Sequence, residues 1–424
     1  MYGLIREGLA GITLGRGGKR DGRVGSTVLL LGLTSMFTDV SSEMVTAVLP
    51  IYLLFQQQAS VVQFGIIDGL YQGASALFRL VAGFLADRLD RQKEVAAAGY
   101  ALSMLTRLGM ILTPGATAFM ALVAVDRFGK GIRTAPRDAL ISRAASDESL
   151  GAAFGLHRAL DTVGAMLGPI LAFAVLALAP RRFDAVFVLS LSFAVIGVAI
   201  IALFVRNPQQ PAAAKRRPTF AESLRVLREA GGFRAVVVAG GMVAFFTLSD
   251  AFVYLVLQRT TDVGMAYFPL LFLGTSIAYF LLAIPLGRVA DRIGRVPTFL
   301  GGQMVLLAVY GVLLLAPSML AATPGVTVAL TLLLFGAFYA STDGVLAAAA
   351  SATLPDAQRA SGLSILGTVT AVARLASSVA FGVLWTVQGP TAALLLFTAG
   401  LAVTVVLAAG SFRRASRGAG AHAA

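Results

Sequence analysis

The chain has 424 residues and a net charge of +13, with 57% hydrophobic residues and only 13% charged residues. Soluble domains contain about 25% charged residues, so this composition excludes an ordinary soluble enzyme, a disordered chain and a coiled coil. The chain has no cysteine and two histidines, which excludes disulfides, a thiolate metal site, a cysteine nucleophile and a histidine metal cluster. We expect a polytopic membrane protein with no metal and no cofactor.

Apolar segments of membrane-spanning length follow one another along the chain. The twelve predicted spans are 27–55, 63–87, 95–113, 117–140, 150–179, 184–205, 234–258, 266–287, 297–316, 325–353, 360–387 and 390–412. About 20 apolar residues cross a bilayer as a helix, and in lipid only helices and closed barrels satisfy the backbone. The sequence therefore predicts an all-α fold with twelve transmembrane helices. The first span carries Asp39 and Glu43 and is longer than the apolar part of a signal peptide, so we expect it to be retained.

The basic residues predict the orientation of the chain. The predicted outer loops hold three of the 34 lysines and arginines, and most of the others fall in predicted cytoplasmic segments. Because basic residues favour the cytoplasmic side, we expect both termini in the cytoplasm of a bacterial or archaeal cell, with the protein in its inner membrane. The predicted parts are a basic segment 1–26, a six-helix bundle 27–205, a basic linker 206–233, a second bundle 234–412 and a tail 413–424. Topology explains the positive charge better than nucleic-acid binding does.

A nine-residue motif occurs twice at an offset of 204 residues. G-F-L-A-D-R-L-D-R follows the second span, and G-R-V-A-D-R-I-G-R follows the eighth. The matching pairs are Gly83 and Gly287, Asp87 and Asp291, Arg88 and Arg292, and Arg91 and Arg295. Such an internal repeat predicts two pseudo-symmetric six-helix halves, an arrangement that many secondary transporters share.

Two further motifs lie in single spans. The fourth span contains Arg127-x-x-Lys130-Gly131, and the fifth contains Gly164-x-x-x-Gly168-Pro169. With the doubled loop, these motifs make residues 27–412 resemble the major facilitator superfamily. The stretch G-K-G-I-R-T-A-P-R-D-A-L-I in the fourth span is similar to one prokaryotic branch of that family. The resemblance implies a secondary transporter that works by alternating access between two bundles.

The resemblance also implies a role for the doubled loop as a conformational latch. In the family this loop stabilises the outward-facing state. Asp87 would face the start of the eleventh helix, and Arg91 would pair with an acid at the inner end of the fourth helix, for which Asp138 is the nearest match. The alternative is a solvated turn that only follows the distribution of basic residues.

The first span carries two acids one turn apart. A charge at the centre of a membrane helix costs about 2.5–3.5 kcal/mol on insertion scales, so such residues must pair or line water. Asp39 and Glu43 are at positions i and i+4 and share one face. Neighbouring carboxylates disfavour each other's ionisation, so we expect this pair to carry a proton. The alternative is that arginines of neighbouring helices permanently neutralise both acids, and that these ion pairs only hold the helices together.

The fourth and fifth spans carry most of the other intramembrane charges. Asp126, Lys130, Arg133 and Arg137 lie within about 60° of one another on the fourth helix. The resemblance attributes proton or substrate coupling to Arg127 on the adjacent face, and the alternative is an interior ladder of salt bridges. The fifth span holds His157, Arg158 and Asp161. His157 and Asp161 share a face with Gly164 and Gly168, which allow another helix to approach closely; they have either a coupling role or that of a structural pair.

The second half carries fewer intramembrane charges. Asp250 and Arg374 lie several turns from their helix ends, so we expect both to face the substrate cavity. Asp343 lies nearer the inner side. Asp68, in the first half, lies near the predicted start of its span, and we expect no special role for it.

These observations predict proton-coupled efflux of a small molecule by antiport, because the glycine-proline motif of the fifth span is similar to that of proton-coupled antiporters. The alternatives are import or uniport of an organic anion attracted by the basic fourth span, and a membrane sensor that does not transport. The expected partners are a small-molecule substrate, protons and the lipid bilayer, without nucleic acid, and the expected state is a monomer. We expect no enzymatic activity, and no phosphate-binding loop indicates ATP as an energy source.

Overall fold

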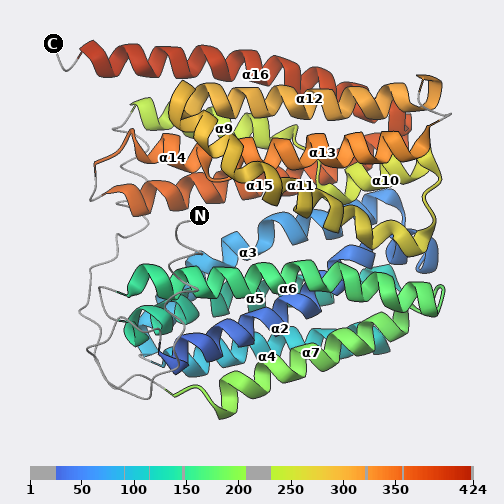
Figure 1. Cartoon of the computed structure of the whole chain (residues 1–424), viewed down its shortest axis with the longest axis vertical. Helices are drawn as coiled ribbons and strands as arrows, with labels where there is room; N and C mark the ends of the chain where they lie inside the picture. The colour runs from blue at the N-terminus through green and yellow to red at the C-terminus, as the bar shows by residue number, and fades with distance from the viewer. Residues whose placement is uncertain are drawn as a thin grey trace. The chain divides into compact units, whose positions relative to one another are not determined.

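The computed structural model describes residues 25–89, 91–113, 115–145, 149–206, 231–319, 323–355 and 358–421. These residues form helices and connecting turns, with no strand among them. The helices in chain order are α2 (Ser26–Ile51), η1 (Tyr52–Gln56), α3 (Val61–Leu89), α4 (Gln92–Leu112), α5 (Ala116–Ala144), α6 (Leu150–Leu178), α7 (Phe183–Leu203), α9 (Gly231–Phe245), α10 (Asp250–Thr261), η2 (Met265–Tyr267), α11 (Phe268–Ile293), α12 (Arg295–Met319), α13 (Pro324–Thr342), α14 (Val345–Ser351), α15 (Arg359–Gln388) and α16 (Pro390–Ala421) (Figure 1).

The predicted all-α fold with twelve transmembrane helices is confirmed. Each predicted span corresponds to one helix or to consecutive helices: the first to α2 with η1, the seventh to α9 with α10, the eighth to η2 with α11, and the tenth to α13 with α14. Ten of these segments are long and apolar enough to cross a membrane. Helices α3 and α5 have 29 residues each, as does α6, and α5 is continuous although it carries the charged residues described below.

The parts predicted outside the two bundles fall largely outside the described residues. This applies to residues 1–24, to the linker from 207 to 230 and to residues 422–424. Helix α16 continues to Ala421, so most of the segment predicted as a tail is helical. The orientation of the termini and the domain boundaries stay predictions.

The chain divides into two compact units. The first comprises residues 1–59, 74–214 and 265–273, and the second comprises residues 60–73, 215–264 and 274–424. In the first unit, α2 packs against α6 and α7, and α4 packs against α5 and α7. In the second unit, α12 packs against α13 and α16, and α9 packs against α15 and α16.

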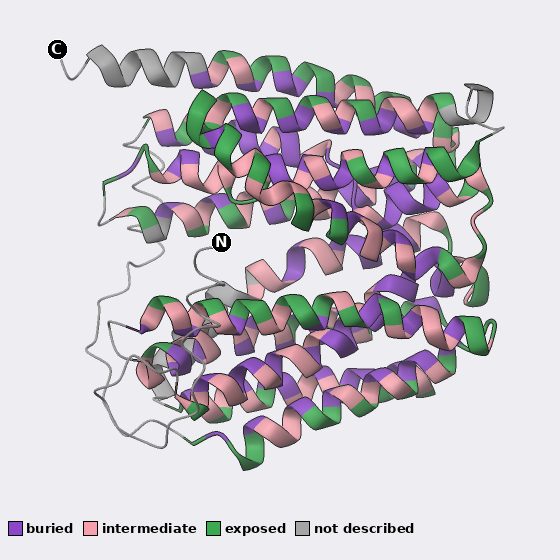
Figure 2. Cartoon of the chain, in the orientation of Figure 1, coloured by how far each residue is buried: buried purple, intermediate pink, exposed green. Residues whose placement is uncertain are grey.

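The surface of the helices is rich in large apolar side chains. The most exposed include Leu178, Leu203, Val387 and Val406. Buried residues occur as stripes along the helices, between stripes of exposed and half-buried residues (Figure 2). An apolar outer surface is expected of a protein whose solvent is the hydrocarbon of a bilayer.

Two of the predicted spans are interrupted. In the tenth, α13 ends at Thr342 and α14 begins at Val345, and Gly344 between them has a φ of +74°. Glycine adopts this left-handed conformation without the strain that a side chain would introduce. In the seventh, residues 246–249 separate α9 from α10. The hydropathy of the sequence predicted neither interruption, because both halves of each span are apolar.

The interruption of the seventh span frees backbone groups that need partners inside a membrane. The hydroxyl of Tyr310 accepts a hydrogen bond from the Leu248 amide at 2.7 Å and donates one to the Phe246 carbonyl at 3.0 Å. Ser377 donates to the Thr247 carbonyl at 3.0 Å. The Ser249 hydroxyl accepts from the Phe252 amide at 3.3 Å and so caps α10. Side chains of α12 and α15 therefore hold the interrupted backbone in place.

Replacing Tyr310 with phenylalanine should destabilise the second unit. The variant keeps the ring but leaves the Leu248 amide and the Phe246 carbonyl without this partner, and an unsatisfied buried group costs about 1–3 kcal/mol. Thermal unfolding of the purified protein in detergent should show a lower midpoint than the wild type. Tyr267→Phe is the control, because Tyr267 is exposed. Equal midpoints for the two variants would show that the Tyr310 hydroxyl does not stabilise the interruption.

Candidate functional site

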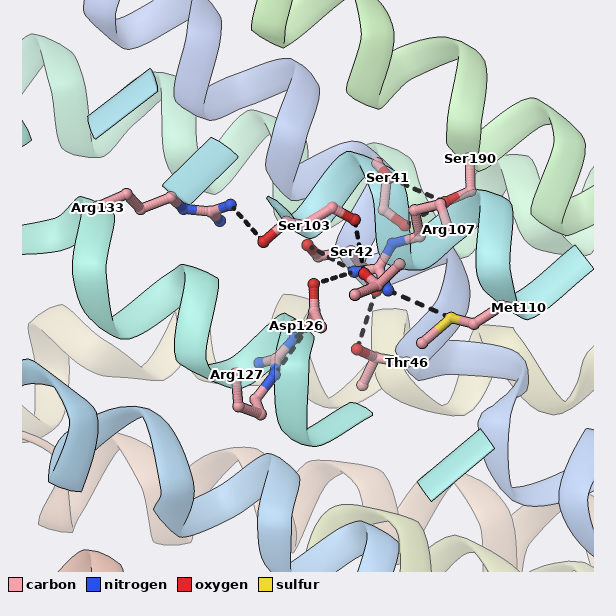
Figure 3. A network of polar contacts seen from close by, with 11 residues as sticks. Ser41, Ser42, Thr46, Ser103, Arg107, Met110, Asp126, Arg127, Arg133 and Ser190 are labelled. Carbon is pink, nitrogen blue, oxygen red and sulfur yellow. Dashed lines mark hydrogen bonds and ion pairs between the residues drawn. The ribbon is translucent and has the colours of Figure 1, made fainter. Parts of the chain in front are cut away.

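Most of the predicted intramembrane charges of the first unit meet between α2, α4, α5 and α6. The first group surrounds Asp126 of α5, which is 1% exposed. Arg107 of α4, also 1% exposed, donates from Nη2 to Asp126 Oδ1 at 3.1 Å and to Ser42 Oγ at 3.3 Å. Arg127 donates to Asp126 Oδ2 from both Nε and Nη2. One buried carboxylate thus binds two arginines from two helices (Figure 3).

The next two arginines of α5 bind polar groups of α2 and α4. Arg133 is 3% exposed; it donates to Ser103 Oγ at 3.2 Å and lies 4.4 Å from the centre of the Tyr100 ring. Arg137 donates to Ser35 Oγ at 3.4 Å, and Ser35 in turn bonds the Tyr100 hydroxyl at 2.9 Å. Arg133 and Arg137 therefore follow the Asp126 group along α5, after about two and about three helical turns.

Asp39 and Glu43 of α2 are half-buried, and so is Lys130 of α5. The charges that act on Lys130 include both carboxylates as well as Arg127 and Arg133. The structure thus brings together the two acids of the first span and the lysine that stands in the R-x-x-K-G segment. This grouping agrees with the shared helix face that their spacing predicts.

Two glycines of α6 determine how closely it approaches α2. A Cβ added to Gly164 would lie 2.5 Å from the Met36 carbonyl oxygen and 3.2 Å from Asp39 Cβ. A Cβ added to Gly168 would lie 2.7 Å from Glu43 Cβ. Each glycine therefore packs directly against one of the two acidic residues, and Pro169 is buried beside them. The glycine-proline motif and the acidic pair belong to one helix–helix contact.

The remaining charges of α6 lie one to two turns from this contact. His157 Nε2 lies 3.5 Å from Asp161 Oδ2, as expected for positions i and i+4 on one helix. Asp161 interacts electrostatically with Asp39, Lys130, Arg137 and Arg158. Arg158 itself is exposed. Asp161 therefore forms part of the charged group around Asp39, and Arg158 lies at its margin.

The predicted latch residues are only partly described. The side chains of Gly83, Asp87 and Arg88 lie outside the described residues, and Arg91 is exposed at the start of α4. Asp138 accepts hydrogen bonds from Arg137 at 2.9 and 3.1 Å, so its pairing with Arg91 stays a prediction.

In the second copy of the loop, Gly287, Asp291 and Arg292 belong to the last turns of α11. Arg295, at the start of α12, donates to the Ala348 carbonyl of α14 at 3.0 Å. This contact joins the loop to a neighbouring helix of the same unit and uses a carbonyl near a helix end. The role of the loop as a latch stays a prediction.

A second polar group lies at the interruption of the seventh span, within the second unit. Asp250 begins α10 and accepts a hydrogen bond from the Tyr339 hydroxyl of α13. Arg374 of α15 interacts electrostatically with both residues. Asp250 and Arg374, predicted separately from their depth in the membrane, are therefore neighbours with opposite charges.

Asp68 of α3, for which the sequence predicted no special role, joins the same group. Its side chain is 4% exposed and accepts a hydrogen bond from Ser378 of α15 at 2.6 Å. The start of α3 lies very close to α15, because a Cβ on Gly65 or Gly69 would lie 2.6 to 2.8 Å from a backbone carbonyl oxygen of α15. The spacing of these glycines in the sequence was the available signal.

A cavity of about 410 Å³ opens beside this group, within the second unit. Its walls come from α9, α12, α13, α14 and α15, and they include Tyr339 and Arg374. Among the described residues, no group of three or more histidines, cysteines and acids is arranged to hold a metal ion.

Sequence reasoning missed Arg107, Asp68 and Tyr310 as organising residues. Arg107 falls within the predicted span 95–113, and nothing in the sequence pairs it with Asp126, 19 residues away. The roles of the predicted site residues stay predictions, and the structure adds their neighbours.

The model of the Major Facilitator Superfamily matches residues 31–274, more than half of the chain. An uncharacterised MFS-type transporter of Methanocaldococcus jannaschii is 28% identical over 383 residues, which are 88% of this chain and 92% of the relative. An uncharacterised protein of Mycobacterium tuberculosis is 33% identical over 156 residues, 37% of this chain and 38% of that protein.

Solved structures share the fold at low sequence identity. A mutant of the nucleoside transporter NupG has a TM-score of 0.77 and 14% identity, with 91% of this chain and 100% of that chain covered. A bacterial homologue of the human lysosomal transporter Spinster, in an inward-facing and unoccupied conformation, has a TM-score of 0.68 and 16% identity, with 92% and 96% covered. The chain belongs to the Major Facilitator Superfamily of membrane transporters.

Proposed function

We propose that this transporter is driven by protons, which Asp39 and Glu43 carry. The observation that supports the proposal is the position of these two acids, one turn apart on α2, packed on Gly164 and Gly168 and close to Lys130. Neighbouring carboxylates disfavour each other's ionisation. A proton bound to one of the two acids would relieve this repulsion, which is strong away from water.

Protonation would also change the contact between helices. The attraction between Lys130 and the two acids stabilises a conformation in which α2 and α5 lie close together. A proton on either acid weakens this attraction. If this attraction is stronger in one conformation than in another, binding of the proton changes how much each of the two is populated. This is the coupling that alternating access requires.

We propose efflux by antiport as the direction. It is supported by the Gly164-x-x-x-Gly168-Pro169 motif, which packs against the proton-carrying acids and so links proton binding to the α2–α6 contact. The second candidate is import or uniport of an organic anion, favoured by Lys130, Arg133 and Arg137 on one helix. We further propose a monomer without enzymatic activity in a bacterial or archaeal inner membrane, with both termini in the cytoplasm.

The test uses the full chain in liposomes that contain a pH-sensitive dye. Organic cations, organic anions, sugars and metabolites are added one at a time to the wild type and to the Asp39→Asn, Glu43→Gln double variant. We expect a substrate-triggered proton flux in the wild type and only the background of protein-free liposomes in the variant, because neither amide binds a proton. The direction of the flux relative to the substrate gradient separates antiport from symport.

The control is Asp184→Asn, which removes one partner of an exposed ion pair with Arg182 and should leave the flux unchanged. A proton flux of wild-type size in the double variant would refute the proposal and assign the acids a bracing role. Substrate flux without proton movement would also refute the proposal, and it would indicate uniport or another coupling ion.

A further inference from the structure

The cavity of about 410 Å³ in the second unit has the size of a pocket for a small organic molecule. Its walls are largely apolar. They include Val243 of α9, Leu346 of α14, Leu363 and Leu366 of α15, and the rings of Phe299 and Phe338. A ligand that fills this space must therefore have an apolar body.

The threonine hydroxyls in the wall of the cavity already donate their protons to backbone carbonyls. Thr247 donates to the Val243 carbonyl at 2.9 Å, Thr342 to the Phe338 carbonyl at 2.8 Å, and Thr370 to the Leu366 carbonyl at 2.9 Å. A hydroxyl has one proton to donate and two lone pairs to accept with. Each of these threonines therefore offers the cavity an acceptor and no donor.

Gln303 of α12 adds a further acceptor. Its side chain is 2% exposed, it lines the cavity, and its Oε1 atom has no hydrogen-bond partner among the described residues. Buried polar atoms nearly always have a partner in native structures. An unpartnered buried oxygen in the wall of a cavity indicates a ligand that brings an N–H or O–H donor.

The wall carries one acidic and one basic side chain, Asp343 and Arg374. Arg374 is balanced by Asp250, with which it interacts and which Tyr339 also binds. Asp343 is exposed at the cavity, and its neighbour is the uncharged Tyr279 hydroxyl at 3.5 Å. The carboxylate of Asp343 is thus the charge that the wall leaves uncompensated. Aromatic rings beside it favour a cation as well.

We infer that this cavity binds an amphipathic organic cation, a protonated amine with an apolar body whose N–H groups donate to Gln303 Oε1 and to the Asp343 carboxylate. The inference deepens the proposed function, because it names the substrate class of a proton-driven carrier. It also favours efflux of a cation over uptake of an organic anion.

The test compares three fluorescent probes with the same dansyl body. The first ends in a five-carbon primary amine (dansylcadaverine), the second is its N-acetyl derivative, and the third ends in a carboxylate on a chain of the same length. Binding to the purified full chain is followed by the change in dansyl fluorescence. We expect the ammonium probe to bind most tightly and the carboxylate probe least tightly.

Variants then assign the binding to the cavity. Asp343→Asn and Gln303→Leu should each lower the affinity for the ammonium probe about tenfold, which corresponds to about 1.4 kcal/mol of binding free energy. Gln303→Glu keeps the shape of the side chain and adds a negative charge, so it should raise the affinity for the ammonium probe. A gain of affinity in this variant cannot come from misfolding, so it tests the role of residue 303 even if the leucine variant folds poorly. Gly301→Ala is the matched control on α12, because no atom lies within 4 Å of the added Cβ; it should bind as the wild type does.

The outcomes separate this inference from the proposed function. Absence of ammonium binding, equal binding of the ammonium and acetylated probes, or unchanged binding in both the Asp343→Asn and Gln303→Leu variants would overturn the inference. The Asp39→Asn, Glu43→Gln double variant should bind the ammonium probe as the wild type does while its proton flux is lost. Ammonium binding that needs Gln303 and Asp343, without any proton flux in the wild type, would support the inference and refute proton coupling.

Discussion

Replacing Asp126 with asparagine should lower the free energy of unfolding by about 3–5 kcal/mol, the usual effect of breaking a buried ion pair. The side chain is 1% exposed and binds two arginines, Arg107 and Arg127. The amide keeps the shape of the carboxylate but removes the negative charge that both guanidinium groups bind. We expect a much lower yield of monodisperse protein in detergent and a large fall in the thermal midpoint.

A compensating variant separates charge from shape at this position. Buried ion pairs can be replaced by apolar residues of similar size at little cost, whereas the loss of one partner is expensive. Asp126→Leu combined with Arg107→Met should therefore be more stable than Asp126→Asn alone. Asp184→Asn, which breaks an exposed pair, should melt like the wild type. If Asp126→Asn also melted like the wild type, the group around Asp126 would not brace α4 and α5.

Replacing Gly168 with leucine should disrupt the contact between α2 and α6. Its added Cβ would lie 2.7 Å from Glu43 Cβ and 2.9 Å from the Met44 amide nitrogen. Because one of these atoms belongs to the backbone, a helix must move. Overpacking of this kind costs about 1–3 kcal/mol, and the displacement would also move Glu43 relative to Lys130. We expect a lower thermal midpoint together with loss of the proton flux.

The control is the same substitution at Gly155, on the same helix, where no atom lies within 4 Å of an added Cβ. Gly155→Leu should retain both stability and flux. Proton flux is measured in liposomes and stability by thermal unfolding in detergent. Equal behaviour of the two leucine variants would show that close packing at Gly168 is not needed to position Glu43.

Most of the helix boundaries were predictable, because a long run of apolar residues in a membrane protein forms a helix that spans the bilayer. The interruptions at residues 246–249 and at Gly344 were not, since each depends on partners elsewhere. The hydroxyl of Tyr310 becomes a partner for Leu248 only when α12 packs beside the interruption. The sequence separates these two residues by 62 positions.

The candidate site was predictable to the level of single helix faces. The spacing of Asp39 and Glu43, and of Gly164 and Gly168, indicated that each pair shares a face, and the structure packs these two faces on each other. Spacing along one helix does not say which other helix it meets. For the same reason Arg107 and Asp68 remained two unassigned charges, and their partners Asp126 and Ser378 lie on other helices.

The sequence by itself determined that this protein is an all-α membrane protein of twelve spans with a duplicated loop, because hydropathy and repeats are properties of the chain read in one dimension. The tertiary structure alone decided which buried charges neutralise one another, where two spans are interrupted, and that Gln303 and Asp343 line one cavity. These features depend on distances between side chains of different helices. The packing of helix surfaces sets those distances, and no local pattern encodes them.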